Sequence, residues 1–217
     1  MRMYNPEWEA IKDFDYPATM VEAQFDLAGV EIPEDHGYAL FQALCRHLPW
    51  LVQTPDAAVQ SVHGAPSGRN ANLVINRRVK LLLRIPVDRA KDVEALVGKT
   101  IDAGAGAIVI GALKVRQLMP SQTLYAHFAD MGTEDEAEFL ARAKAELEAM
   151  GIQCGLMCGK RRQLTTPEGQ VVGYSLMLHD LSLLQSMQVI ERGLGRHRIY
   201  GCGIFVPHKS IKEVAAS

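Results

Sequence analysis

The first part of the chain changes its hydrophobic period twice. Apolar residues occupy every second position over residues 21–27, with polar residues between them, which predicts a half-buried strand. The apolar residues of 40–48 instead fall on one helical face, and Pro49 would end that helix. Alternation returns over residues 79–85, so a further strand is expected there.

Shorter patterns complete this half. Residues 57–63 predict a short strand, and the polar segment 64–72 predicts a loop. Asp88 is suited to cap a helix that ends at Gly98. With an apolar run at its end, the half has the order βαββαβ: strands at 21–27, 57–63, 79–85 and 107–118, helices at 40–48 and 88–97.

The second half repeats that order. Residues 124–128 alternate as a strand would, and Thr133 with Glu136 forms a capping box for a helix whose apolar stripe runs from 140 to 150. Gly193 is suited to cap the last helix. The remaining predicted elements are strands on both sides of the turn at 166–169, a helix at 183–190 and a short strand at 204–206.

Two consecutive units of one plan predict an α+β protein made of tandem ferredoxin-like (RRM-like) βαββαβ domains. The junction is expected at Pro120-Ser121. The predicted organisation is an acidic N-terminal lead at 1–20, an N-terminal domain at 21–120 and a C-terminal domain at 121–217 that carries a glycine-rich loop at 193–203.

The composition is that of an ordinary globular protein. The chain has 217 residues, of which 48% are hydrophobic, and the N-terminus lacks the pattern of a signal peptide. The longest uncharged apolar run, 103–113, is far shorter than the roughly 20 residues of a membrane span, so a cytoplasmic protein is expected. Cys154 and Cys158 have no second pair that would complete a zinc site, so neither a metal nor a cofactor is expected.

Charge is divided unevenly along the chain, although the net charge is only −2. Residues 1–35 hold two basic and nine acidic residues, whereas residues 160–212 hold eight basic and three acidic residues. Such a division lets one surface attract a polyanion while the molecule stays near neutral. Scattered, solvated charge is the alternative interpretation.

The segment GLGRHRIYGCG at 193–203 concentrates glycine and basic residues. A dinucleotide-binding glycine motif follows a strand and opens a helix, whereas this segment follows a predicted helix and leads into a strand. Glycines here could bring backbone amides close to a phosphate backbone, with Arg196, His197 and Arg198 as charged donors. A purely structural turn is the alternative.

Three segments resemble a known family. GLGRHRIYGCGIF at 193–205 is similar to the C-terminal glycine-rich loop of the CRISPR-associated endoribonuclease family that cuts precursor CRISPR RNA within its repeats. PEDHGYALFQALCRHLPWL at 33–51 resembles the first helix of the Myxan-type subgroup, and RRVKLLLRIP at 77–86 resembles its basic strand. The glycine loop also occurs in noncatalytic repeat-associated RNA proteins, so the helix segment is the more specific signal.

The resemblance implies metal-independent RNA cleavage. In that reaction a 2′-hydroxyl attacks the neighbouring phosphate and leaves a 2′,3′-cyclic phosphate and a 5′-hydroxyl. The chemistry needs a base, an acid and cations around the phosphate, and histidine suits the first two roles because its unperturbed pKa is ~6.5.

His36 is the predicted catalytic histidine, because it begins the first helix and because the family places its histidine there. The second catalytic group is left open between His63, in a loop that could fold back, and Tyr38, which points to a different side of the helix. His47 is interpreted as a helix-end residue, and His127 and His179, on predicted strands, as structural residues.

The expected partner is CRISPR repeat RNA, with effector-complex proteins as further candidates and no DNA or membrane. Basic residues would bind its backbone, and glycines would let it approach closely. The predicted RNA-binding residues are Arg77, Arg78, Lys80, Arg84, Lys160, Arg161, Arg162, Arg192, Gly193, Gly195, Arg196, His197, Arg198, Gly201 and Gly203.

Three functions follow from these interpretations. The first is a repeat-specific endoribonuclease. The second is a noncatalytic RNA-binding subunit of a CRISPR effector complex, which would bind repeat RNA without cutting it. The third is a ferredoxin-like metabolic enzyme, which tight, salt-sensitive RNA binding would argue against.

Overall fold

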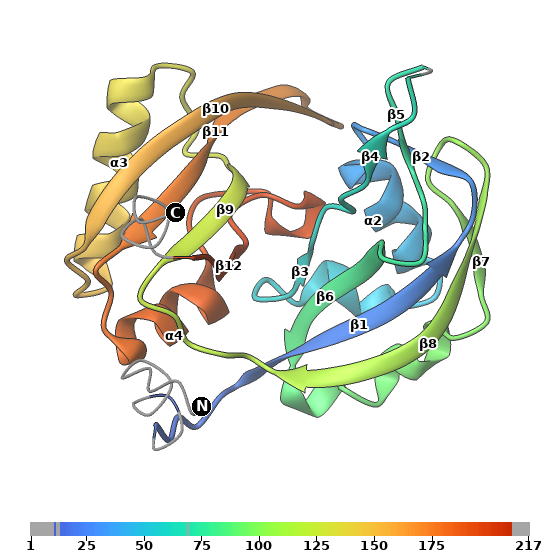
Figure 1. Ribbon diagram of the computed structural model, residues 1–217, viewed down its shortest axis with the longest axis horizontal. Coiled ribbons are helices and arrows are strands. Elements are labelled where there is room, and N and C mark those ends of the chain that lie inside the picture. Colours follow the sequence, from blue (N-terminus) through green and yellow to red (C-terminus); the bar gives the residue numbers. More distant parts are fainter. Residues whose placement is uncertain (1–10, 12–13, 69, 210–217) are drawn as a thin grey trace, which may run out of the picture.

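The computed structural model describes residues 11, 14–68 and 70–209, and it folds into two halves that lie side by side (Figure 1). Most of the predicted acidic lead, residues 1–10 and 12–13, lies outside this part of the chain. No helix among the described residues is long and apolar enough to cross a membrane.

The N-terminal half is built on a five-stranded antiparallel sheet. Its strands lie in the order β3-β6-β1-β8-β7, with β1 in the middle between β6 and β8. The bounds are β1 Met20–Ala28, β3 Ala58–Val59, β6 Lys80–Pro86, β7 Thr100–Asp102 and β8 Ala107–Gln117.

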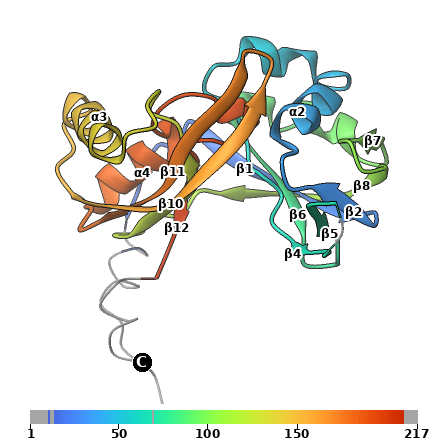
Figure 2. The same cartoon turned by 90° about the horizontal axis from the view of Figure 1, so that it is seen from above.

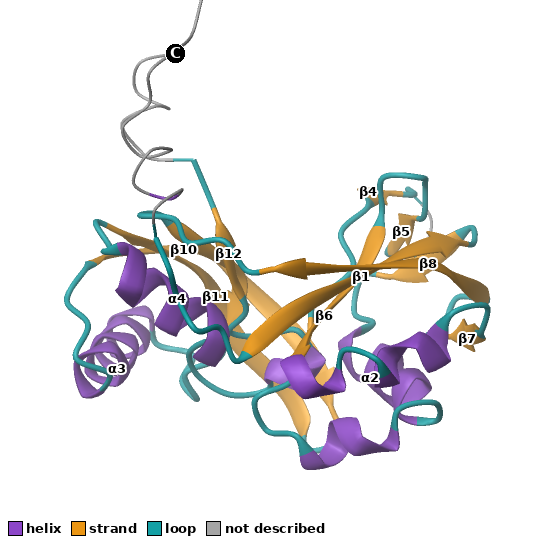
Figure 3. Ribbon diagram, turned by 90° about the horizontal axis from the view of Figure 1, so that it is seen from below, coloured by secondary structure: helices purple, strands orange, loops and turns teal. Residues whose placement is uncertain are grey.

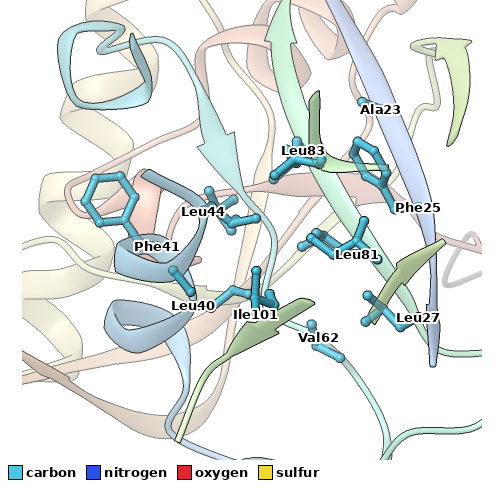
Figure 4. Close-up of a cluster of buried hydrophobic side chains, with 14 of the residues drawn as sticks. Ala23, Phe25, Leu27, Leu40, Phe41, Leu44, Val62, Leu81, Leu83 and Ile101 are labelled. Atoms are coloured by element: carbon cyan, nitrogen blue, oxygen red, sulfur yellow. The ribbon is translucent and has the colours of Figure 1, made fainter. Parts of the chain in front are cut away.

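Helix α2, Gly37–Cys45, covers one face of this sheet. The alternation predicted for β1 places Phe25 in the core, where it meets Leu81 and Leu83 of β6 and Leu44 of α2 (Figure 4). These four side chains are completely buried, so the apolar face of the helix and that of the sheet hold the half together.

The C-terminal half has a four-stranded sheet in the order β10-β11-β9-β12. The helices α3 and α4 pack on the face that carries Leu124, Ala126, Leu176 and Leu178. The bounds are β9 Leu124–Ala129, α3 Glu136–Ala149, β10 Gly155–Thr166, β11 Gly169–His179, α4 Leu183–Arg192 and β12 Phe205–Pro207.

The prediction of tandem ferredoxin-like folds is confirmed. In each half the second, third, first and fourth strands of the repeat lie side by side in that order, as the βαββαβ plan requires. The halves have separate cores, and Pro120-Ser121 lies in the segment between β8 and β9. The exact domain boundary stays a prediction.

Two local predictions in the N-terminal half are wrong. The segment 88–97 forms no α-helix but two short 3₁₀ turns, η2 Val87–Arg89 and η3 Asp92–Leu96, because only eleven residues separate Pro86 from Gly98 and Asp88 makes no cap hydrogen bond. The polar segment 64–72 is not wholly a loop, since it contributes one strand and the first residue of another to a small sheet. This sheet has the order β2-β5-β4, with β2 Glu31–Pro33, β4 Ala65–Pro66 and β5 Asn72–Val74.

The helix caps of the C-terminal half agree with the sequence in one case of two. The side chain of Asp135, not Thr133, accepts the hydrogen bond from the backbone amide of Glu138 at 2.8 Å and caps α3. Thr133 instead donates its hydroxyl to the Glu138 carboxylate. Helix α4 ends at Gly193, as predicted, with a φ of 67° that favours glycine.

Candidate functional site

A cleft of about 890 Å³ lies where the two halves meet. Its walls are the start of α2, the loop 61–64 after β3, the middle of β9 and the β10–β11 hairpin. Figure 2 shows this hairpin reaching past its own sheet toward α2. The Asp35 carboxylate accepts a hydrogen bond from the backbone amide of Thr165 at 3.1 Å. This bond holds the β10–β11 hairpin next to the start of α2.

Two histidines face each other in this cleft. The ring centroids of His63, from the loop, and His127, from β9, lie 3.9 Å apart with an interplanar angle of 36°. Removal from water by the cleft walls, followed by the fields of His127, His36 and Arg162, lowers the pKa of His63 to about 4. Burial and the Arg162 guanidinium also lower the pKa of His127, so both rings are neutral at pH 7.

Arg162 supplies positive charge beside the two rings. It lies on β10 and lines the cleft, and its buried Nε has no hydrogen-bond partner among the described residues. A buried donor without a partner is costly in a folded protein. An anion bound in the cleft reaches this atom only after the side chain shifts, because the atom itself is buried. Arg161 also lines the cleft but pairs with Glu134, with an Nη2–Oε2 distance of 2.9 Å.

His36, the predicted catalytic histidine, borders the same cleft, and its catalytic role stays a prediction. Only 2% of the side chain is exposed. Its Nδ1 donates to the carbonyl of Pro33 at 2.6 Å, and its Nε2 accepts from the backbone amide of Val62 at 2.8 Å. These partners fix a neutral tautomer and occupy both nitrogens, and burial lowers the pKa of the ring. His36 therefore holds the loop that carries His63.

Tyr38, the other catalytic candidate, lies outside the cleft. Its hydroxyl accepts a hydrogen bond from Gln42 at 2.7 Å, and its ring packs edge-on against Tyr200 at 5.5 Å. The structure therefore brings His36 and His63 together and leaves Tyr38 on another side of α2, as the helical spacing indicated.

The glycines of 193–203 have a different role from the predicted one. A Cβ on Gly195 would meet the carbonyl oxygen of Asp130, and one on Gly201 would meet the Ser61 hydroxyl. All four glycine amides donate within the protein: Gly193 to Val189, Gly195 to the Glu146 carboxylate, Gly201 to Arg198 and Gly203 to Phe128. No free glycine amide is therefore available for a phosphate at these four positions, and the glycines serve close packing.

The basic residues of this loop are divided between surface and interior. Arg196, 60% exposed at its side chain, and His197 both bond to the buried carboxylate of Asp130. Arg198 is only 8% exposed and donates to the carbonyl of Glu191 at 2.8 Å, so its prediction as an RNA contact is contradicted. Arg192 is exposed at the end of α4.

The prediction of Arg84 as an RNA-binding residue is also corrected by the structure. Its side chain is 3% exposed, and Nη1 donates to the carbonyls of Ile190 at 2.6 Å and Phe205 at 3.1 Å. Arg84 therefore joins the β6 strand to the C-terminal half and is not offered to RNA. The remaining basic candidates are accessible: Arg77, Arg78 and Lys160 are exposed, and Lys80 is half-buried beside Asp26.

His127 lines the cleft, although sequence interpretation gave it no functional role. It was taken as structural because it lies on a strand, and β9 is indeed a strand. A signal was present, because His127 alternates with the buried Ala126 and Phe128 and so belongs to the face that the helices leave open. The described residues contain no group of three or more His, Cys, Asp and Glu placed to hold a metal.

Comparison with known proteins gives consistent matches. A family model described as Cas6 Crispr matches residues 21–210. The curated CRISPR-associated endonuclease Cas6 of Myxococcus xanthus is 36% identical over 188 residues, which cover 86% of this chain and 81% of that protein.

Solved structures share the fold at lower identity. A Cas6-related protein from Pyrococcus furiosus superposes with a TM-score of 0.65 and 13% identity, covering 88% of this chain and 99% of that one. Cse3 of Thermus thermophilus, bound to an RNA representing a pre-cleavage complex, gives 0.51 and 15%, covering 87% and 98%. At these identities the similarity concerns the fold.

Proposed function

The chain belongs to the Cas6 family, and from this premise we propose that it is an endoribonuclease that cleaves precursor CRISPR RNA within its repeats. The observation that carries the proposal is the group formed by His63, His127 and Arg162 in the cleft between the halves. Two imidazoles beside an unpaired guanidinium are the groups that cleavage of RNA by its own 2′-hydroxyl requires.

In the proposed reaction the 2′-oxygen bonds to the adjacent phosphorus, and the bond from phosphorus to the 5′-oxygen breaks. The products are a 2′,3′-cyclic phosphate and a 5′-hydroxyl. His63 takes the 2′-hydroxyl proton, since its low pKa keeps the ring neutral and able to accept it. His127 protonates the leaving oxygen, because a bound phosphate nearby favours a proton on one ring of the pair.

Arg162 balances the charge that develops on the phosphate, since its Nε is already buried and unpartnered beside the two rings. His36 is a positioning residue: its bond to the Val62 amide keeps the neighbouring His63 in the cleft. Because His36 fixes the loop, His63 keeps its orientation when RNA binds.

The partner is CRISPR repeat RNA. We assign its backbone to the exposed basic groups of the β10–β11 hairpin, Lys160 and Arg161, and to the Arg192 and Arg196 side chains. Arg77, Arg78 and Lys80 extend this surface on the N-terminal half. A paired repeat would be bound through the shape and backbone of its A-form helix.

The test is an incubation of the purified protein with the repeat RNA of its own locus in EDTA, beside the same RNA with a 2′-deoxy nucleotide at the cut site. Cleavage that leaves a cyclic phosphate and disappears with the 2′-deoxy substrate supports the proposal. RNA that is bound but remains whole would instead favour the noncatalytic RNA-binding subunit. Cleavage of the 2′-deoxy substrate would reject the mechanism.

A further inference from the structure

The C-terminal sheet has an open face with an unusual row of rings. Figure 3 shows α3 and α4 on one side of the C-terminal sheet. Because these helices cover the face of Leu124 and Ala126, the alternate residues Tyr125 and His127 belong to the other face. The rings of Tyr125 and His127 meet edge-on at 4.9 Å, and His208 lies 5.4 Å from Tyr125. We call Tyr125, His127 and His208 the ring platform.

The surroundings of the ring platform are apolar and accessible. Strand pairing places Met177 of β11 and Val206 of β12 on both sides of Tyr125, and Met157 lies beyond Met177. Met157, on this face of the sheet, is 49% exposed, whereas the opposite face is well packed. Partly exposed flat rings among flexible apolar side chains suit a planar, partly apolar ligand.

The position of the platform identifies that ligand. His127 belongs both to the platform and to the cleft, where it faces His63. A chain that leaves the cleft along β9 therefore passes directly over Tyr125 toward His208. His208 is exposed and held beside β9 by its backbone bond to Thr123, and Lys209 follows it as an exposed cation for a backbone phosphate.

We propose that the ring platform is a binding site for unpaired nucleobases of the RNA segment that adjoins the scissile phosphate. This inference rests on the proposed function and adds a binding site for the RNA that flanks the cut. Bases stack on Tyr125 and His208 through their faces, so the site tolerates different sequences. The segment must be unpaired, because a base inside a duplex has both faces covered by its neighbours.

The experiment measures dissociation constants with uncut, 2′-deoxy-blocked repeat RNA that carries unpaired flanks. Tyr125→Leu keeps apolar volume but removes the ring, and it should weaken binding about fivefold or more. Tyr125→Phe should restore the affinity, since the ring returns. The matched control is Leu184→Ala, which removes a 52% exposed apolar side chain from α4 on the covered side of the sheet.

A second RNA, with abasic nucleotides in both flanks, completes the cycle. The wild-type protein should bind abasic RNA more weakly than intact RNA, by the same factor by which Tyr125→Leu weakens binding to intact RNA. Tyr125→Leu itself should bind abasic RNA as tightly as it binds intact RNA. If Tyr125→Leu changes the thermal unfolding, His208→Ala, which alters an exposed position outside the strands, replaces it with the same expected pattern.

The outcomes separate the two proposals. Two results would overturn the platform while cleavage by the wild-type protein upholds the function. In the first, Tyr125→Leu binds intact RNA with the wild-type affinity. In the second, Tyr125→Leu weakens binding to abasic RNA by the same factor as binding to intact RNA. Failure of the wild-type protein to bind or cut any repeat RNA would overturn the function and the platform with it.

Discussion

At the residue scale, His36 is expected to matter for folding. His36→Ala removes two buried hydrogen bonds and leaves the Val62 amide unpaired, so the free energy of unfolding should fall by about 1–3 kcal/mol. Urea denaturation at pH 7.5 measures this loss. His63→Ala is the control, since the His63 ring lines the cleft and makes no such hydrogen bond among the described residues, and equal stability of both variants would contradict the assignment.

The same histidine predicts a pH dependence of stability. Burial lowers the pKa of His36 from its ordinary value of 6.5, so the folded state binds fewer protons than the unfolded state below that pH. The stabilisation from neutral His36 is therefore complete above pH 6.5 and is lost as the pH falls below it. The stability difference between wild type and His36→Ala should shrink between pH 7.5 and pH 5.

His63 predicts the pH dependence of cleavage. If it is the base, the acidic limb of kcat/KM follows its pKa in the free protein, which is about 4. The rate should then rise as the pH falls from 7 to below 6 under limiting protein and trace RNA, because the lowered pKa of the acid His127 leaves little of that ring protonated at pH 7. A limb centred near 6.5 would show that a histidine in an ordinary environment, and not His63, controls the reaction.

The residue-level predictions from sequence failed where burial decided the outcome. Arg84 and Arg198 carry suitable chemistry, yet both are bound inside the protein. The sequence made His63 a catalytic candidate but not His127, because their pairing joins residues 64 positions apart in the chain through the contact between the two halves. Spacing along one helix or strand contains no information about such a contact.

At the scale of elements, the β10–β11 hairpin should carry part of the RNA affinity. Lys160→Ala removes one exposed cation, so binding should weaken and the slope of log K against log salt should fall by about 1. Lys144→Ala is the matched control, because that exposed lysine lies on α3 and pairs with Glu148 at 3.7 Å. Equal salt slopes for Lys160→Ala and wild type would remove the hairpin from the interface.

Elements with a strong period were predictable. The alternation of residues 21–27 and 79–85 placed β1 and β6 correctly, and Gly193 marked the end of α4. The prediction for Pro49 is wrong, because α2 already ends at Cys45 and Pro49 begins the 3₁₀ turn η1 Pro49–Gln53. The glycine loop was located but misinterpreted: its glycines allow the loop to pack on Asp130 and Ser61, which a composition argument cannot distinguish from ligand binding. The alternative of a structural turn describes these glycines better.

At the scale of the whole molecule, Arg84 should hold the two halves together. Arg84→Met leaves the carbonyls of Ile190 and Phe205 without their donor and Glu22 without its partner, at a cost of about 3 kcal/mol. Lys80→Met on the same face of β6 should cost less than about 1 kcal/mol, because its ion pair with Asp26 remains partly exposed to solvent. Calorimetry measures the loss of stability in both variants. A loss for Arg84→Met as small as that for Lys80→Met would contradict the role of Arg84 in joining the halves.

The repeat of βαββαβ gave the fold, but not how the halves meet. That arrangement depends on the buried Arg84 side chain, which the sequence presented as a further basic residue of an RNA surface. The cleft follows from this arrangement, so the active site could be predicted only in part.

The most direct test compares single-turnover cleavage of repeat RNA in EDTA by wild-type protein and His63→Ala. We expect the variant to bind RNA with little change and to cut about 10²- to 10⁴-fold more slowly, since it lacks the base in the cleft. Cleavage by His63→Ala at the wild-type rate, with the same cyclic phosphate product, would contradict the assignment of the active site to the His63–His127 cleft.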